Sequence, residues 1–431
     1  VIFKSKHEVS IMKINVYGSG LSAWVAAACL AKVGNDVVID ELSDGPMLSL
    51  ETISIIDDEP GLLGQIQQQI ADGRLVRQPS GGEVAATVHW LALQPSEQHI
   101  AERVIDGLSR TKAVALLVIN QCNFAVGASE GLQSRLANVG DVVYVPDNLQ
   151  DGAALQGFMR PNQIILGADN SRALVKTKAL FRPFSHELDA LQLMSSREAE
   201  FTKFAITGML AIRLGYINEL ANLADQLGVD ITMVQDGMGA DPRVGHHYLS
   251  PGCGFGGQNF SAYLSTFSGI LQQQRDASLL TTVIDENELQ KELLFRKFWQ
   301  HNQGDVRDKV VAIWGASFKP GTASIDNAPS LRIIDALVSQ GVRVRIHDPE
   351  ATANLQQHYP AEPLISYVDT PLAALDGADA LFLVTEWPLY WSPDYVAMLN
   401  LMRTPLVIDG RNVFDKDMLQ QSGFVYLGVG R

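Results

Sequence analysis

The sequence predicts an α/β protein in which two parallel-sheet domains are joined by a long central helix and a helical middle domain. Short β-branched runs alternate with helix-length segments from Met12 onward, and the same alternation resumes after Asp305. That alternation is typical of βαβ units. Between the two halves, residues 197–229 carry apolar residues at spacings of three and four over a length too great for a crossover helix.

The predicted elements follow the chain in order. The first half contains the predicted strand segments KINVYGSG, DVVIDEL, TVHWLAL, AVALLVIN, DVVYVP and QIILGAD, with a helix in LSAWVAAACLAKVG. The second half contains KVVAIWGASF, VRVRIHDP, DALFLVTEW, PLVIDGRNVF and FVYLGVG, with a helix in SLRIIDALVSQG. We therefore predict domains over residues 12–196, 197–304 and 305–431. Residues before Met12 are left out of the predicted fold.

Composition narrows the class of protein. At about 150 residues per domain, 431 residues suggest about three domains. The 33 basic and 48 acidic residues give a net charge of −15, which argues against nonspecific electrostatic binding to nucleic acid or to an anionic membrane. The chain shows neither an apolar run of about 18 residues nor a secretory pattern at its start. We expect a cytoplasmic protein that holds any anionic ligand locally.

The chain has three cysteines, namely Cys29, Cys122 and Cys253. An odd number without CxxC spacing supports neither a disulfide framework nor a cysteine zinc site, and we predict no metal. One thiol could still serve as a nucleophile. Its position relative to other motifs must decide that question.

A glycine-rich turn follows the first predicted strand and opens a helix. In this context Gly18 permits the tight turn, Gly20 lets the backbone approach a pyrophosphate, and Leu21 and Ala23 begin a helix that packs closely on the strand. The helix N-terminus would hold the phosphates. Asp40 and Glu41 both lie about 20 residues downstream and either would bind the ribose hydroxyls, favouring NAD over NADP. A turn without a ligand, or one that binds FAD, remains an alternative.

A second glycine-rich segment, residues 251–257, has backbone amides that could wrap a phosphate or sugar, although a plain flexible loop has the same composition. Arg243, Lys319 and Arg411 could each neutralise a diphosphate, although an isolated Arg or Lys is usually only a surface charge.

Taken in order, these segments resemble the UDP-glucose/GDP-mannose dehydrogenase family from Met12 to Arg431. The motifs that carry the resemblance are Glu59-Pro-Gly-Leu62, Glu198-Ala-Glu-Phe-Thr-Lys203, Ile217-Asn-Glu219, Asp241-Pro-Arg243, the loop 252–257, Phe318-Lys-Pro320, Asp348-Pro349, Thr385-Glu-Trp387 and Asp409-Gly-Arg-Asn412.

The resemblance implies an N-terminal NAD-binding Rossmann domain, a central helix that forms a homodimer through residues 200–228, and a C-terminal Rossmann-like domain that binds a UDP- or GDP-linked sugar. It implies that NAD oxidises the sugar C6 alcohol to a carboxylate in two hydride transfers through a cysteine thioester, in polysaccharide or sugar-nucleotide metabolism. It also places substrate contacts at Arg243, Gly254, Phe255, Gly256, Gly257, Phe318, Lys319 and Arg411.

The chain differs from this family at several positions where the family has its catalytic residues. The family loop has the pattern GxGYGGSCFPKD, so Asn259 occupies the nucleophile position and Tyr263 that of an aspartate that assists water chemistry. The family's Ser-Thr-x-Pro turn matches residues 122–125, so that Asn123 replaces the threonine. Thr207 replaces an asparagine four residues after the catalytic lysine, and Asp326 replaces an arginine. Asp147 and Asp151 replace glutamates.

Lys203 is kept, and with Asp147 or Asp151 it could support a first oxidation. A structural ion pair of Lys203 with Glu200 or Asp147 is the alternative. An amide nitrogen is not a nucleophile at neutral pH, so Asn259 cannot form the covalent intermediate. Cys253 would have to swing toward the sugar to replace it.

The sequence therefore predicts a divergent member of this family, an NAD-dependent nucleotide-sugar oxidoreductase with an altered active site, which stops after one oxidation or acts at another position. A catalytically silent paralogue that binds NAD or a nucleotide sugar as a regulatory or hetero-oligomer partner is the alternative.

Overall fold

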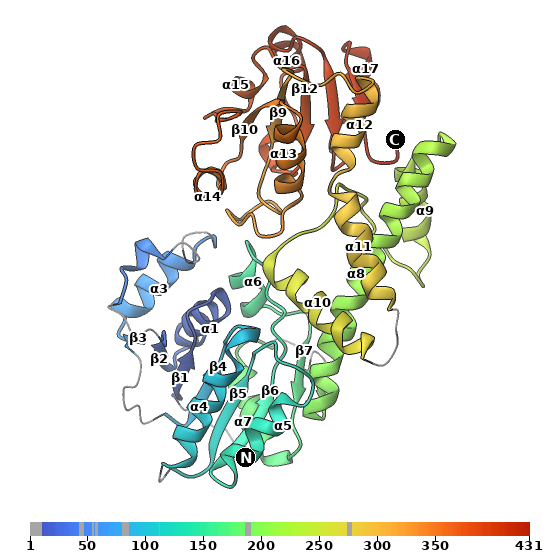
Figure 1. The fold of residues 1–431 in the computed structure, drawn as a ribbon. Coiled ribbons are helices and arrows are strands. Elements are labelled where there is room, and N and C mark those ends of the chain that lie inside the picture. Colours follow the sequence, from blue (N-terminus) through green and yellow to red (C-terminus); the bar gives the residue numbers. More distant parts are fainter. Residues whose placement is uncertain are drawn as a thin grey trace, which may run out of the picture. The chain divides into compact units, whose positions relative to one another are not determined.

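The computed structural model describes residues 11–42, 47–53, 56, 59–79, 86–111, 113–185, 191–273 and 278–431. The chain divides into two compact units, residues 1–203 and 204–431, and the boundary falls within the long helix α8 (Ser196–Leu227) (Figure 1). Helix α8 coincides with the predicted central helix. The finer division into three domains stays a prediction, and the segment before Ile11 lies outside the described residues.

The first unit is built on an eight-stranded sheet with the order β3-β2-β1-β4-β5-β6-β7-β8. Neighbouring strands are parallel except β6 and β7, which meet in antiparallel orientation. Strands β2 and β3 are added on one side of β1, and the strands from β4 onward are added on its other side. This order is that of a doubly wound dinucleotide-binding fold. The strands are β1 (Lys13–Tyr17), β2 (Asp36–Asp40), β3 (Leu75–Gln78), β4 (Val88–Leu91), β5 (Leu116–Asn120), β6 (Gly140–Tyr144), β7 (Ile164–Gly167) and β8 (Leu191–Met194).

Helices cover both faces of this sheet, which is why strands β4 to β7 are fully buried. Side chains of α1, α3, α6 and α7 form one core with the sheet, and those of α4 and α5 form another. The small residues of α1 let it lie close to the strands, and residues 23–31 are all buried. The helices are α1 (Leu21–Lys32), α3 (Leu62–Ala71), α4 (Gln98–Ser109), α5 (Ala128–Leu136), α6 (Ala154–Met159) and α7 (Ser171–Phe181), with 3-10 turns η1 (Leu50–Thr52) and η2 (Pro95–Glu97).

The second unit begins with the rest of α8 and a group of helices. These are α9 (Ile231–Ala240), α10 (Gln258–Gln272), α11 (Leu279–Gln290) and α12 (Leu293–His301). Ile217 and Ala221 of α8 pack with Ile231, Leu293 and Val429, so the last residues of the chain belong to the helical core.

A six-stranded, fully parallel sheet completes the second unit, in the order β11-β10-β9-β12-β13-β14. Helices α12, α13 and α14 cover one face, and α15, α16 and α17 cover the other. The elements are β9 (Val310–Trp314), α13 (Pro329–Ser339), β10 (Arg343–His347), α14 (Thr352–His358), β11 (Ile365–Tyr367), α15 (Pro371–Leu375), β12 (Ala380–Leu383), η4 (Pro388–Tyr390), α16 (Tyr395–Leu401), β13 (Leu406–Asp409), α17 (Lys416–Gln421) and β14 (Val425–Leu427). The predicted fold class, with two α/β parts and a helical middle, is confirmed.

The sequence analysis did not predict three of the strands, namely β3, β8 and β11. Each lies at an edge of its sheet and is only partly buried. Edge strands carry polar residues because one side faces solvent, so they lack the continuous apolar runs of central strands.

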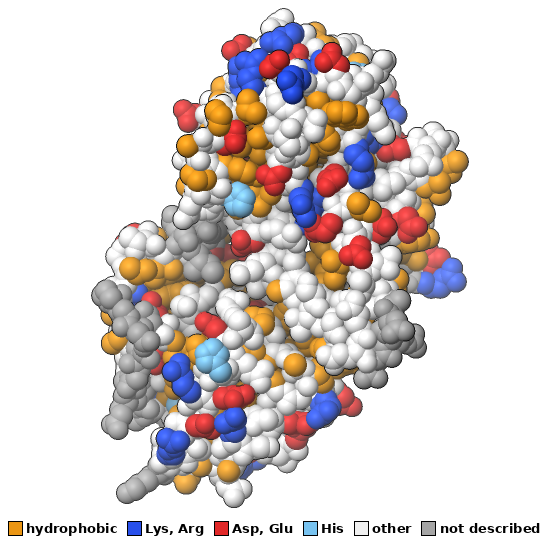
Figure 2. Space-filling view, in the orientation of Figure 1, with side chains coloured by type: hydrophobic (Ala, Val, Ile, Leu, Met, Phe, Trp, Pro, Cys, Tyr) orange, Lys and Arg blue, Asp and Glu red, His pale blue; other side chains and the backbone are white. Residues whose placement is uncertain are grey.

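Two surface properties follow from the described residues. Acidic and basic side chains are intermixed over the face shown in Figure 2. Among the described helices, none is both long enough and apolar enough to cross a bilayer.

Candidate functional site

The predicted glycine turn lies between the carboxyl ends of β1 and β4. Gly18 has φ +139°, and a Cβ there would lie 2.2 Å from the carbonyl oxygen of Ala92. Gly20 is the N-cap of α1, and a Cβ on it would approach Gln94 Nε2 to 3.1 Å. Helix α1 then begins at Leu21, so its first amides open beside this turn. The turn keeps its shape only with glycine at position 18, and the backbone is left accessible to a pyrophosphate.

A pocket of about 400 Å³ adjoins the turn. Apolar side chains form most of its wall, and the acids are Glu41 and Glu97. The lining residues are Gly18, Ser19, Trp24, Glu41, Leu42, Met47, Leu48, Ile53, Leu93, Glu97 and Ile100. An apolar wall with an acid near the end of β2 suits the adenosine half of a dinucleotide.

The two acids predicted for the ribose differ in position. Glu41 lines the pocket, and its Oε1 accepts a hydrogen bond from Arg77 Nε at 2.7 Å. Asp40 is 6% exposed, and its Oδ1 accepts from the Leu42 amide at 3.0 Å. The Asp40 carbonyl oxygen also accepts from the Gly18 amide. Asp40 therefore supports the turn, while Glu41 faces the pocket.

Lys203 lies near the loop that follows β6. Its Nζ donates to Asn148 Oδ1 at 3.2 Å, and the neighbouring Asp147 accepts from Ser22 Oγ at 2.5 Å. Burial lowers the pKa of Lys203, and the nearby Asp147 carboxylate opposes this shift. The structure thus brings Lys203, Asp147 and the first turn of α1 into one region of the first unit. Asp151 lies four residues farther along the same loop.

Two glutamates, Glu59 and Glu200, hold the loops around this region through hydrogen bonds that the sequence did not predict. Glu59 is buried and accepts from the amides of Gly152 and Ala154 at 2.6 and 2.8 Å, so it fixes the start of α6. Glu200 accepts from the amides of Gly127 and Ser129 at 2.6 and 2.8 Å and so fixes the start of α5. A carboxylate at a helix N-terminus is stabilising. Glu200 therefore has a capping role of its own, apart from the ion pair with Lys203 that the sequence left open.

The altered turn after β5 is also described. Cys122 is buried, its Sγ accepts from the Leu93 amide, and burial raises the pKa of this thiol. Asn123 Oδ1 is buried and has no hydrogen-bond partner among the described residues. Cys122 is thus part of the core rather than a reactive thiol.

In the second unit, three amide side chains hold the predicted glycine loop in place. Asn218 of α8 accepts from the Gly252 amide at 2.9 Å, and Gln290 of α11 donates to the Gly252 carbonyl at 2.7 Å. Asn287 of α11 accepts from the Phe255 amide at 2.9 Å and donates to its carbonyl at 3.0 Å. Asn218, Asn287 and Gln290 are polar residues that lie on buried faces of their helices. For α11, the polar residues of the segment NELQK are the feature of the sequence that indicates such a face.

Arg411 and the crowded glycines complete the loop. Arg411 Nη1 donates to the Gly254 carbonyl at 3.2 Å and its Nε lies 3.2 Å from Glu386 Oε2. A Cβ on Gly256 would lie 2.5 Å from the Asn327 carbonyl oxygen, and one on Gly257 would lie 2.9 Å from the Phe318 ring. The loop is therefore a packed structure and not a loose linker.

The other predicted basic residues are placed differently. The Arg243 side chain is 87% exposed and pairs with Asp241 at 2.7 Å. Lys319 Nζ lies 5.5 Å from the centre of the Phe318 ring. Phe318 and Lys319 thus lie beside the glycine loop, whereas Arg243 extends into solvent from the turn after α9.

Helix α10 starts directly after the glycine loop, and Asn259 lies in its exposed first turn. Ser261, one residue beyond Phe260, accepts from Asn327 Nδ2 at 2.7 Å, and Asn327 Oδ1 accepts from Lys291 Nζ at 2.6 Å. Tyr263 is buried, with its ring 5.2 Å from that of Phe204.

Cys253 belongs to the core of the second sheet. It is 0% exposed, and its Sγ lies 3.8 Å from the Val384 carbonyl oxygen. Burial raises the pKa of this thiol. The predicted alternative, in which Cys253 swings toward a substrate, finds no support in this position.

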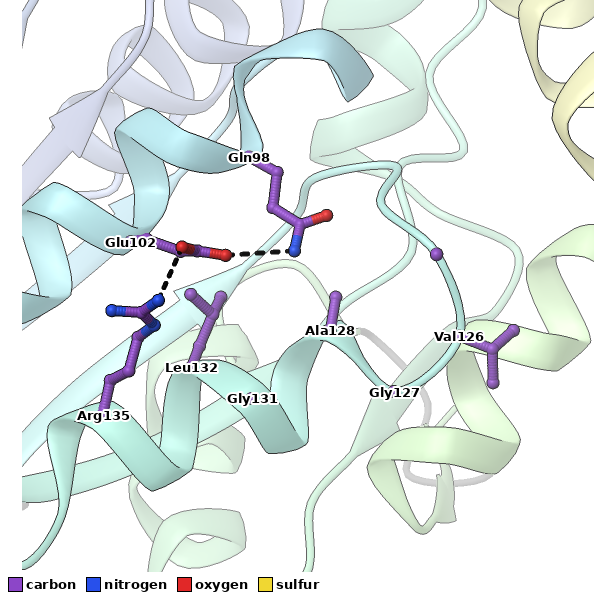
Figure 3. A pocket seen from close by; sticks show the side chains of 9 residues that line it. Gln98, Glu102, Val126, Gly127, Ala128, Gly131, Leu132 and Arg135 are labelled. Atoms are coloured by element: carbon purple, nitrogen blue, oxygen red, sulfur yellow. Dashed lines mark hydrogen bonds and ion pairs between the residues drawn. The ribbon is translucent and has the colours of Figure 1, made fainter.

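Another pocket, of about 260 Å³, lies between α4 and α5 in the first unit (Figure 3). Its polar side chains bind one another, since Glu102 accepts from Gln98 and pairs with Arg135 at 2.8 Å. We assign no ligand to it. Among the described residues, no cluster of three His, Cys, Asp or Glu side chains forms a metal site.

Comparison with known proteins identifies the family to which the chain belongs. Three models of the UDP-glucose/GDP-mannose dehydrogenase family match the chain: the NAD binding domain over residues 12–185, the central domain over 197–289 and the UDP binding domain over 312–416. The UDP-glucose 6-dehydrogenase of Pseudomonas aeruginosa is 36% identical over 97% of this chain and 98% of its own length. The chain belongs to the UDP-glucose/GDP-mannose dehydrogenase family.

Further relatives agree with this assignment. The UDP-glucose 6-dehydrogenase of Rhizobium meliloti is 30% identical over 97% of this chain and 100% of its own length. The structure of a UDP-glucose dehydrogenase from Pyrobaculum islandicum superposes with a TM-score of 0.83 and 25% identity, covering 100% of this chain and 99% of that one. As a family member, the chain is of the NAD-dependent nucleotide-sugar dehydrogenase type.

The residues present fit NAD. Gly18 lets the turn approach the Ala92 carbonyl more closely than any Cβ would allow, and Glu41 lines the adjoining pocket. Gly18, Gly20, Leu21 and Ala23 would hold the pyrophosphate end, and an acid after β2 the ribose. The family's UDP binding domain likewise supports a nucleotide sugar as the second ligand.

Proposed function

We propose that this protein uses NAD to oxidise a nucleotide sugar once, at the sugar C6 alcohol, and releases the product of that single step. The UDP binding domain and the UDP-glucose 6-dehydrogenase relatives support a UDP-linked hexose as the substrate class. The observation that carries the proposal is Asn259, which stands where the family pattern has its cysteine while the glycine loop before it remains fully held.

The second oxidation by the family route requires a thiolate that adds to the aldehyde. The Asn259 side-chain amide has its nitrogen lone pair delocalised and cannot serve as that nucleophile. Cys253 is enclosed in the core of the sheet. Loss of a covalent nucleophile costs on the order of 10⁴-fold or more in rate, so this step is removed rather than slowed slightly.

The first oxidation needs fewer groups. Bound NAD would supply the hydride acceptor. Lys203 Nζ, with its pKa lowered by burial, would take the hydroxyl proton of the sugar, directly or through a water. Asn148 orients Nζ through its 3.2 Å hydrogen bond, and Asp147 ties the same loop to Ser22 of the cofactor turn. Asp151 lies within the same loop as an additional acid.

A second candidate function is a silent paralogue that binds NAD or nucleotide sugar without turnover. Tyr263 favours it, because the family's aspartate position is filled by a buried ring that packs on Phe204. Thr207, one helical turn after Lys203, likewise replaces an asparagine. These changes remove groups expected to position water, while the loop frame that would bind the nucleotide is kept.

One experiment separates these functions. The protein is incubated with NAD and a panel of UDP- and GDP-sugars, and NADH is counted per sugar consumed. One equivalent supports the proposal, and two equivalents with a uronic acid product refute it. No NADH, together with calorimetric binding of either ligand, supports the silent paralogue. Asn259→Cys alone should not restore two equivalents, because Asn123, Thr207 and Tyr263 also differ.

We further propose that two copies associate through α8, in the cytoplasm, in support of polysaccharide or sugar-nucleotide synthesis. Met209, Tyr216 and Leu223 are spaced by seven residues along α8 and are 57%, 51% and 48% exposed. Residues seven apart lie on one side of a helix, so they form an apolar stripe that a second copy would cover.

A further inference from the structure

A mostly buried ion pair adjoins the pocket beside the glycine turn: Glu41 lines the pocket, and Arg77 lies behind it. Arg77 of β3 places Nε 2.7 Å from Glu41 Oε1, and the two side chains are 13% and 9% exposed. Glu41 follows directly after β2, and β2 and β3 are neighbouring parallel strands. An arginine thus lies directly beside the acid expected to contact the ribose.

Arg77 also touches two other walls of the same pocket. Its Nη2 donates to the Leu48 carbonyl oxygen at 2.8 Å, and its guanidinium carbon lies 5.4 Å from the centre of the Trp24 ring. Trp24, Glu41 and Leu48 all line the pocket. The guanidinium is therefore fixed by an ion pair, a backbone hydrogen bond and a cation–π contact, and it holds three parts of the wall together.

The geometry gives this pair a consequence for the ligand. Glu41 uses Oε1 for Arg77, and among the described residues no hydrogen bond to Oε2 occurs, so Oε2 can accept from a ribose hydroxyl. A carboxylate at this position excludes a 2′-phosphate by repulsion, whereas an arginine attracts one. The pair therefore combines a carboxylate that repels a 2′-phosphate with a guanidinium that attracts one. The charge on Glu41 determines which of the two effects dominates.

We propose that Arg77 is a specificity-determining residue of the cofactor pocket. While Glu41 is charged, Arg77 positions it against the ribose of NAD. When a substitution removes the charge at position 41, the same guanidinium becomes the binding group for the 2′-phosphate of NADP. The proposal concerns binding of the dinucleotide alone and does not depend on the number of oxidations.

Calorimetric titration of the full chain with NAD and with NADP tests this role. Glu41→Gln keeps a hydrogen-bonding side chain but removes the charge, and we expect the ratio of NADP to NAD affinity to rise about tenfold or more. Adding Arg77→Met to that variant should abolish the rise. Adding Arg77→Lys instead, which keeps the charge, should retain part of it.

The matched control is Asp36→Asn. Asp36 lies at the other end of β2 and pairs with Arg74, next to β3, at 2.6 Å, so this change breaks a similar ion pair away from the pocket. We expect its affinity ratio to stay within about twofold of the wild type. An unchanged ratio in Glu41→Gln would overturn the proposal, as would a rise that persists when Arg77 is also removed. If Arg77→Met does not fold, Arg77→Gln, which can still donate to Leu48, replaces it with the same expected result.

Discussion

His89 should make the stability of the first unit depend on pH. It lies on β4 opposite Asn15 of β1, is 2% exposed, and has Nδ1 3.0 Å from the hydroxyl of Tyr17. Burial lowers the pKa of His89 from 6.5 to about 4, so the folded protein keeps this ring neutral over a range in which the unfolded chain protonates it.

The sign and size follow from that shift. Above pH 6.5 neither state binds the proton, and His89 does not change the free energy of unfolding. Between pH 6.5 and 4 the unfolded state binds a proton that the folded state does not, so the free energy of unfolding falls by about 1.4 kcal/mol per pH unit. By pH 4 the loss reaches about 3 kcal/mol, and it levels off below that pH because both states are then protonated.

Denaturant titrations of the wild type and of His89→Gln, at pH values from 8 to 3.5, measure this effect. Glutamine is neutral throughout, so the difference between the two proteins isolates the histidine. That difference should shift by about 3 kcal/mol in favour of the variant between pH 7 and pH 4. A difference that stays constant within about 1 kcal/mol would refute the reasoning, because His89 would then titrate alike in the folded and unfolded chain.

Three further predictions concern ligands and assembly. Gly18→Ala should weaken NAD binding by tenfold or more in calorimetry, since its Cβ would lie 2.2 Å from the Ala92 carbonyl oxygen. Unchanged NAD affinity would contradict the role of this turn in binding NAD. Asn287→Ala should raise the Kd for UDP-glucose by about tenfold while leaving that for NAD unchanged, because Phe255 loses both hydrogen bonds to this side chain. A parallel loss of NAD affinity would show general unfolding instead. Leu223→Glu should convert a dimer to a monomer in light scattering, because a charge would enter the apolar stripe on α8; a monomeric wild type would exclude the dimer.

The sequence by itself determined the plan of the chain. Buried parallel strands are continuous apolar runs, so their order and the helices between them can be predicted from local pattern, and β1 and β9 are examples. The glycine turn is equally local, because Gly18 and Gly20 lie within one short segment. The replacement of the expected cysteine by Asn259 is also visible without a structure. Edge strands such as β11 were missed because their residues are half exposed.

The tertiary structure decided which side chains meet. Asp40 and Glu41 are adjacent in the sequence, and only the fold shows that Glu41 faces the pocket beside Arg77, a residue 36 positions away. Cys253 lies in the loop that the chemistry would require, yet the second sheet encloses it. Glu200 could have paired with Lys203 one turn along the helix, but its carboxylate is bound by amides at the start of α5. Local periodicity reports the burial of a residue, whereas hydrogen bonds and ion pairs depend on segments that only folding brings together.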